Sequence, residues 1–227
     1  MPQPLPFRAR TRHGWCVTLT AEQLYRRGVD SSNASRHAAA RRELETALAR
    51  TDDAELRARI VGTLANLISL RGEPERARSL CWAALDGDGI SPHTAAVLHG
   101  QLGLLALGVG DFEETVKYSS RALEGLDAQQ PAHETGEGEG EVRANVLLNR
   151  SVALMQLGRL DASLADLREA SAIFAQVGDA ASNAMCEHNA GYLALLQGDL
   201  VRALDGMERA ARVLRGDSSV AAAIGEI

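Results

Sequence analysis

Amide and hydroxyl side chains recur at a fixed distance before four glycines of the chain. Nine residues before Gly72, Gly110, Gly158 and Gly198 stand Thr63, Gln101, Asn149 and Asn189. Amides both donate and accept hydrogen bonds, so a row of them suits the backbone of an extended peptide whose side chains drop between helices. The spacing therefore predicts a peptide-binding groove.

The same register supplies the flanking positions of this predicted groove. Further members stand six and ten residues before the glycines, and others form a row near the entrance of the groove. The predicted set is Arg59, Thr63, Asn66, Gln101, Leu104, Asn145, Asn149, Val152, Met185, His188, Asn189 and Tyr192. A second interpretation remains open at this stage. The amides could instead bond to the backbone of neighbouring helices and only stabilise their stacking.

Residues that could act as nucleophiles or metal ligands form no convincing catalytic site. Cys186 and His188 are two positions apart on one predicted helix, so they point about 200° apart and cannot readily pair as nucleophile and base. His13 and Cys16 are close only along an irregular segment. The histidines form no metal-ligand cluster, and no glycine-rich phosphate-binding loop is present. We predict that the chain is not an enzyme and takes no cofactor and no metal.

The four glycines belong to a repeat that must position these side chains. They are separated by 38 (72 to 110), 48 (110 to 158) and 40 (158 to 198) residues. Such a period predicts stacked helix pairs, and no segment alternates as a strand would. The predicted fold is an all-α, right-handed α-solenoid of about five helix pairs. The pairs are expected at about 20–33 and 36–50, 53–71 and 74–86, 92–108 and 112–127, 140–157 and 160–177, and 180–197 and 200–214.

The domain organisation predicted from the sequence is one array with three irregular segments. Residues 1–18 carry three prolines and are expected to form an irregular N-terminal arm. The array covers 19–215, and the acidic, glycine-rich residues 128–141 are expected to form a mobile loop that accounts for the 48-residue step. Residues 216–227 are expected to begin a partial sixth unit or a capping helix. The exposed last face of the array would invite a homodimer.

Composition and charge exclude several classes of function. The net charge is −6, which argues against generic nucleic-acid binding. No apolar stretch is long enough for a membrane span, so no membrane partner is expected. The odd number of cysteines, three, fits a reducing, cytoplasmic setting.

The repeats resemble the tetratricopeptide repeat (TPR), over about residues 20–215. That motif has small residues in the middle of its first helix, Gly before the turn, and Ala at two points of its second helix. The fifth unit matches with Gly191, Gly198, Ala203 and Ala210, and the second with Ala65, Gly72, Ala77 and Ala84. The resemblance implies an interaction scaffold. Binding of a C-terminal carboxylate, which some members achieve with basic groove residues, is not expected because only Arg59 and Arg26 are candidates.

A narrower resemblance concerns three sequence segments, which are His99 to Leu105, Leu148 to Leu154 and His188 to Leu193. They are similar to TPR arrays that precede CHAT domains, which are caspase-like cysteine proteases of actinobacteria. This resemblance implies a regulatory or sensor arm without the protease. A peptide-sensing arm of a transcription regulator is a further alternative.

Overall fold

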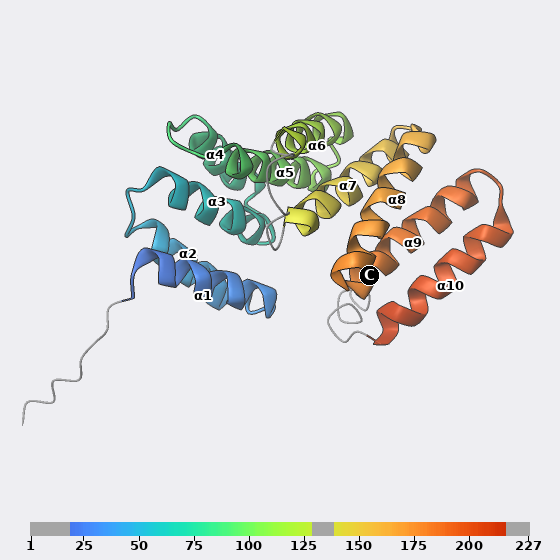
Figure 1. Cartoon of the computed structure of the whole chain (residues 1–227), viewed down its shortest axis with the longest axis horizontal. Helices are drawn as coiled ribbons and strands as arrows, with labels where there is room; N and C mark the ends of the chain where they lie inside the picture. The colour runs from blue at the N-terminus through green and yellow to red at the C-terminus, as the bar shows by residue number, and fades with distance from the viewer. Residues whose placement is uncertain (1–18, 129–138, 217–227) are drawn as a thin grey trace, which may run out of the picture.

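The computed structural model describes residues 19–128 and 139–216 of the chain. In this part it consists of helices and turns, without any strand (Figure 1). The helices are α1 (Ala21–Asn33), α2 (His37–Leu48), α3 (Ala54–Ser69), α4 (Pro74–Leu85), α5 (Pro92–Gly108), α6 (Phe112–Asp127), α7 (Glu139–Gln156), α8 (Leu160–Val177), α9 (Ala180–Leu196) and α10 (Leu200–Gly216). The prediction of an all-α solenoid of five helix pairs is confirmed.

Local side-chain chemistry sets where the helices begin. Thr20 and Gln23 form a capping box, in which each side chain accepts a hydrogen bond from the other residue's backbone N–H. Asp53 and Ser91 cap α3 and α5 in the same way, each accepting from the backbone N–H three residues on. Pro74 stands in the first turn of α4, where its missing N–H is not needed.

A left-handed residue ends the first helix of every pair. Gly72, Gly110, Gly158 and Gly198 all have positive φ, for example 83° at Gly72 and 82° at Gly198. The first pair differs, because Ser35 takes this place with a φ of 55°. L-residues with a side chain adopt this region only at a conformational cost. Ser35 is thus the turn residue of the first pair, 37 residues before Gly72.

Each helix packs on its pair partner and on the next helix of the chain. The first helices of the pairs also contact one another in order, α1 with α3, α3 with α5, α5 with α7 and α7 with α9. They therefore form the inner row of the array. Close packing within a pair depends on small residues: a Cβ on Gly28 would come within 2.6 Å of Leu44 Cγ, and one on Gly103 within 2.8 Å of Ser119 Oγ.

The buried side chains fall into three clusters along the array. The largest runs from Leu24 to Tyr118 and joins α1 to α6. A second runs from Ala122 to Leu193 and joins α6 to α9. The third consists of Ala184, Ala210 and Leu214 in the last pair. The core is therefore continuous only from neighbour to neighbour, as expected for a repeat array.

Three segments predicted from the sequence lie wholly or partly outside the described residues. The arm at 1–18 and the segment 217–227 lie outside the described residues, as do residues 129–138 of the predicted acidic loop. The end of that loop was placed too late, because α7 already begins at Glu139. Acidic residues are favourable in the first turn of a helix, where the end of the helix dipole is positive. The end of the acidic stretch can therefore form the first turn of α7. No helix among the described residues is long and apolar enough to cross a membrane.

The turn at Ser35 yields a stability prediction. Replacing Ser35 by Gly should raise the free energy of unfolding by up to about 1.5 kcal/mol, because relief of a left-handed side-chain residue is worth about 1–2 kcal/mol while glycine loses roughly 0.5–1 kcal/mol of extra chain entropy. Urea unfolding followed by circular dichroism measures the change. The matched control is Gly198→Ser, which should destabilise. A Cβ there meets no atom within 4 Å, so only the backbone conformation is penalised. A Ser35→Gly variant that is less stable than the wild type would contradict the strain at Ser35.

Candidate functional site

A groove lies along the inner row of helices, between α1, α3, α5 and the start of α7. Its volume is about 870 Å³. The groove is lined by Tyr25, Val29, Ser32, Asn33, Glu55, Arg59, Gly62, Thr63, Asn66, His93, Thr94, Val97, Gln101, Glu141 and Val142. Apolar, hydroxyl, amide and charged groups thus alternate along one continuous surface. Concave surfaces of this size, with a few polar groups among apolar ones, are typical of ligand sites.

The groove contains four of the residues predicted from the sequence, namely Arg59, Thr63, Asn66 and Gln101. The other eight are not among its lining residues. Of these, Asn145, Met185, His188 and Tyr192 are exposed, and Leu104, Asn149, Val152 and Asn189 are half-buried. A ligand contact by any of the predicted residues stays a prediction.

One of the predicted amides, Asn145 of the row near the entrance, bonds to its own helix and not to a neighbouring one, so it is no example of the stacking interpretation. The Nδ2 of Asn145 donates a hydrogen bond of 2.9 Å to the backbone carbonyl of Glu141, one turn earlier in the same helix. This amide therefore stabilises its own helix. No hydrogen bond of this kind is found for the Asn66 side chain among the described residues, and Asn66 is exposed in the groove.

The sequence reasoning missed the contribution of the first pair. Tyr25 and Val29 stand ten and six residues before Ser35, which are the same distances that place Gly62 and Asn66 before Gly72. The signal was present, because Ser35 stands at the turn position of the first pair, but the groove rows were counted only from the four glycines. Once Ser35 is taken as the turn residue, α1 joins the groove.

A further row of polar side chains, in the first turns of the inner helices, was also not predicted from the sequence. Glu55, His93 and Glu141 all stand 17 residues before a turn glycine, and all three line the groove. They lie in the first turns of α3, α5 and α7, where the register could have predicted them.

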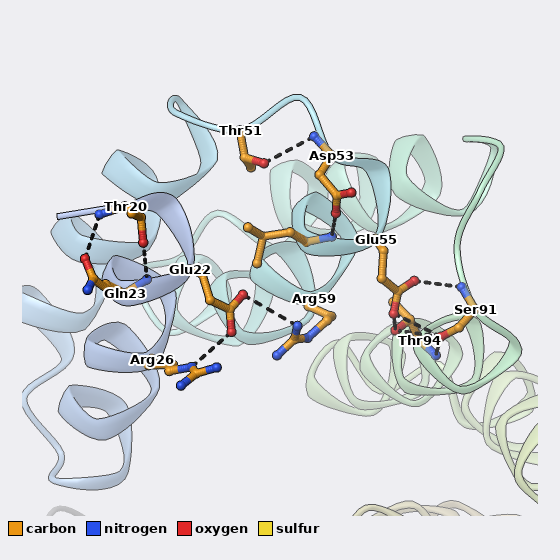
Figure 2. Close-up of polar contacts among 11 residues, drawn as sticks. Thr20, Glu22, Gln23, Arg26, Thr51, Asp53, Glu55, Arg59, Ser91 and Thr94 are labelled. Carbon is orange, nitrogen blue, oxygen red and sulfur yellow. Dashed lines mark hydrogen bonds and ion pairs between the residues drawn. The ribbon is translucent and has the colours of Figure 1, made fainter.

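The basic residues at the start of the groove are already paired with other groups. Arg59 lies 3.7 Å from a carboxylate oxygen of Glu22, and Arg26 approaches the other oxygen at 3.0 Å (Figure 2). The guanidinium of Arg59 also stacks over the ring of Tyr25, at 4.7 Å from its centroid. Two guanidinium groups thus share one carboxylate on α1. This arrangement orients Arg59 and joins α1 to α3.

Glu55 links α3 to the start of α5. Its carboxylate accepts hydrogen bonds from the backbone N–H of Ser91 at 2.7 Å and from the Ser91 hydroxyl at 3.0 Å, and it also accepts from the Thr94 hydroxyl (Figure 2). Partial burial opposes the charged form of Glu55, but the bonds from Thr94 and Ser91 and the nearby Arg59 outweigh it. The pKa of Glu55 is therefore lowered from its ordinary value of 4.5.

Gln101 brings an unused acceptor to the groove wall. Its Oε1 is buried and accepts no hydrogen bond from any described residue. Buried polar atoms are nearly always paired in folded proteins. A ligand that donates an N–H at this point would satisfy the atom.

The described cysteines are poor nucleophiles. Burial raises the pKa of Cys81 to about 12. Burial, with a smaller contribution from Asp179, raises the pKa of Cys186 to about 11. Both are therefore thiols at neutral pH rather than the reactive thiolate. His188 is exposed while Cys186 is buried, so the two do not meet. No cluster of three or more metal-ligating side chains occurs in the part of the chain that the structure describes.

Comparisons with known proteins identify the fold but no close relative. No protein-family model matches the sequence, and no curated protein matches it either. Among solved structures, PlcR of Bacillus thuringiensis in complex with the peptide PapR7 and DNA superposes with a TM-score of 0.73 at 13% identity, covering 91% of this chain and 73% of that one.

Two further structures show the same architecture. A Rap protein complexed with Competence and Sporulation Factor gives a TM-score of 0.66 at 14% identity, covering 87% of this chain and 56% of the Rap chain. YrrB, a TPR protein with an unusual peptide-binding site, gives 0.50 at 17% identity, covering 91% and 92%. At these identities the likeness establishes the fold, which is that of a TPR-like helical solenoid.

The hydrogen bonds of Glu55 predict a pH dependence of stability. The unfolded chain has the higher Glu55 pKa, so it takes up the proton more readily as the pH falls, and the stabilisation present above about pH 4.5 is lost in acid. Glu55→Gln should flatten the fall in the free energy of unfolding between about pH 5 and pH 3. Urea unfolding at a series of pH values measures it. Glu75→Gln, an exposed first-turn acid of α4, is the control and should keep the wild-type slope. An unchanged slope in Glu55→Gln would refute the assignment.

Proposed function

We propose that the chain is a non-catalytic scaffold that binds a peptide or an extended protein segment in the groove between α1, α3, α5 and α7. The observation that carries the proposal is the 870 Å³ groove on the inner row, lined by both polar and apolar side chains. Such a surface can bind a peptide in one orientation and discriminate between its side chains.

The groove offers the two kinds of contact that an extended peptide needs. Thr63, Asn66 and Gln101 supply donors and acceptors for its backbone, while Val29, Val97 and Val142 form apolar contacts for its side chains. Helix axes packed side by side are about 8–10 Å apart. Three such steps from α1 to α7 correspond to roughly seven to nine residues of extended chain at about 3.3 Å each.

The structural neighbours support a peptide ligand. PlcR was solved in complex with the peptide PapR7 and DNA, Rap in complex with Competence and Sporulation Factor, and YrrB is described by its peptide-binding site. All three share the solenoid architecture with this chain. A groove on the inner helices is the feature through which the same function is proposed here.

A second candidate is the peptide-sensing arm of a regulator. It is favoured by the TM-score of 0.73 with PlcR, whose complex contains both a peptide and DNA. In this proposal the groove senses the peptide and a separate partner carries out the response. The regulatory arm of a CHAT-type protease stays a prediction from the sequence alone.

The groove assignment is tested with peptides selected from a random phage-displayed library against the full chain. The double variant Asn66→Ala, Gln101→Ala should weaken binding of a selected peptide at least about tenfold, since each lost hydrogen bond is worth roughly 1 kcal/mol and 1.4 kcal/mol is tenfold. Fluorescence anisotropy of labelled peptide measures the dissociation constant.

Two further variants complete the experiment. Ser79→Ala, on an exposed position of α4 outside the groove, should bind like the wild type. Asn149→Ala with Asn189→Ala shows whether the ligand extends along the rest of the predicted row. Unchanged affinity of the Asn66, Gln101 variant, with helicity intact, would exclude this groove.

A further inference from the structure

Exposed hydrophobic side chains are concentrated at the C-terminal end of the array. Eleven large hydrophobic residues of the described chain are exposed, and nine of them lie between Val177 and Val213. Scattered single hydrophobics are normal on a surface, but a group of them marks an interaction site. The repeat shows which members of this group share one face.

On α6 and α8 the positions two and six residues after the turn glycine hold apolar side chains, which are Phe112, Val116, Leu160 and Leu164. On α8, Leu160 and Leu164 form a stripe together with Ser171, since the three fall within about 40° of one another at about 100° per residue. The Ser171 hydroxyl donates a hydrogen bond of 2.6 Å to Asn183 Oδ1, which shows that the stripe faces α9. Leu160 and Leu164 are half-buried there, packed against the second core cluster.

The same stripe recurs on α10, where no described helix covers it. Leu200 and Leu204 stand two and six residues after Gly198, as Leu160 and Leu164 stand after Gly158. They are 61% and 62% exposed. Leu195 of α9 is likewise 41% exposed, whereas its equivalent on α7, Met155, is 8% exposed. We call Leu195, Leu200 and Leu204 the C-terminal face.

The opposite end of the array offers no matching apolar surface. Residues 19–69 contain no exposed large hydrophobic side chain. The exposed positions of α1 are polar, for example Gln23 and Arg27, and Arg27 is paired with Glu43 at 2.8 Å. Head-to-tail stacking of copies would therefore place an apolar face on a polar one. Within residues 19–128 and 139–216, the C-terminal face of another copy is the apolar surface of the same kind.

We propose that the C-terminal face binds the C-terminal face of a second copy of this chain, in a two-fold symmetric dimer. In such a dimer the same surface of each subunit contacts that of the other, so the assembly ends at two subunits. The flanks of α10 carry exposed groups of both signs, including Asp205, Glu208 and Arg212, so antiparallel helices can place opposite charges opposite one another. The groove is lined by α1 to α7 and stays open in such a dimer.

Light scattering coupled to size-exclusion chromatography of the full chain tests the proposal. The wild type should show twice the chain mass of 24.2 kDa. Leu204→Glu places like charges across the two-fold axis and should raise the dissociation constant of the dimer at least about tenfold. Leu70→Glu is the matched control, because Leu70 is 64% exposed at the end of α3, away from this face. It should leave the dimer intact, and circular dichroism verifies folding of both variants.

A cross-linking measurement keeps the proposal testable if a charged variant fails to fold. Leu204→Cys should form an intermolecular disulfide under mild oxidation, whereas Leu70→Cys should not. Both variants are made in a Cys16→Ser background, and the other native cysteines, at 81 and 186, are buried and do not interfere. A wild type that stays monomeric at about 100 µM, a concentration that detects even micromolar dimers, would overturn the proposal. So would dimerisation that appears only after removal of residues 217–227, because the chain's own last segment would then be the occupant of the face.

Discussion

The structure depends on one constraint: a pair of helices cannot bury its apolar stripe alone and must have it covered by the next pair. Leu164 of α8 illustrates this, since it is half-buried against the second core cluster, which includes residues of α9, whereas the equivalent Leu204 of α10 is 62% exposed. Because the contact is between neighbours, the pattern of residues repeats with the units rather than with a single closed core. The position of every inner helix follows from this stacking.

The groove is a direct result of the same stacking. The first helices of the pairs contact one another in order, so residues at equal distances before the turns fall into rows across them. Covered positions of these helices hold mostly small or aliphatic side chains, and their open positions hold both polar side chains such as Gln101 and apolar ones such as Val97. The ion pair between Arg59 and Glu22 then fixes the first two helices of the row against each other.

The helices could be predicted from the sequence because their signals are local. The capping box at Thr20, the proline at position 92 and the turn glycine at 198 each act within a few residues, and the predicted helix ends differ from the observed ones by only a few positions. The register of the groove was local too, which is why Thr63 and Asn66 were found. The length of the groove could not be predicted, because it depends on the curvature of successive helix pairs. This curvature is not encoded at any single residue. The contribution of α1 was missed because the rows were counted only from the four glycines, and the first pair has Ser35 at its turn.

The division of the buried side chains also governs how the molecule comes apart. The last pair adds a separate cluster of only three residues, whereas the first cluster joins six helices. In arrays of this kind, opening at an end breaks one interface, while opening in the middle breaks two. Amide protons of α10 should therefore exchange through a local opening of lower free energy than those of α3 to α6. A ligand held by α1 to α7 can stay bound during that opening, so fraying of the end and occupancy of the groove are thermodynamically separate events.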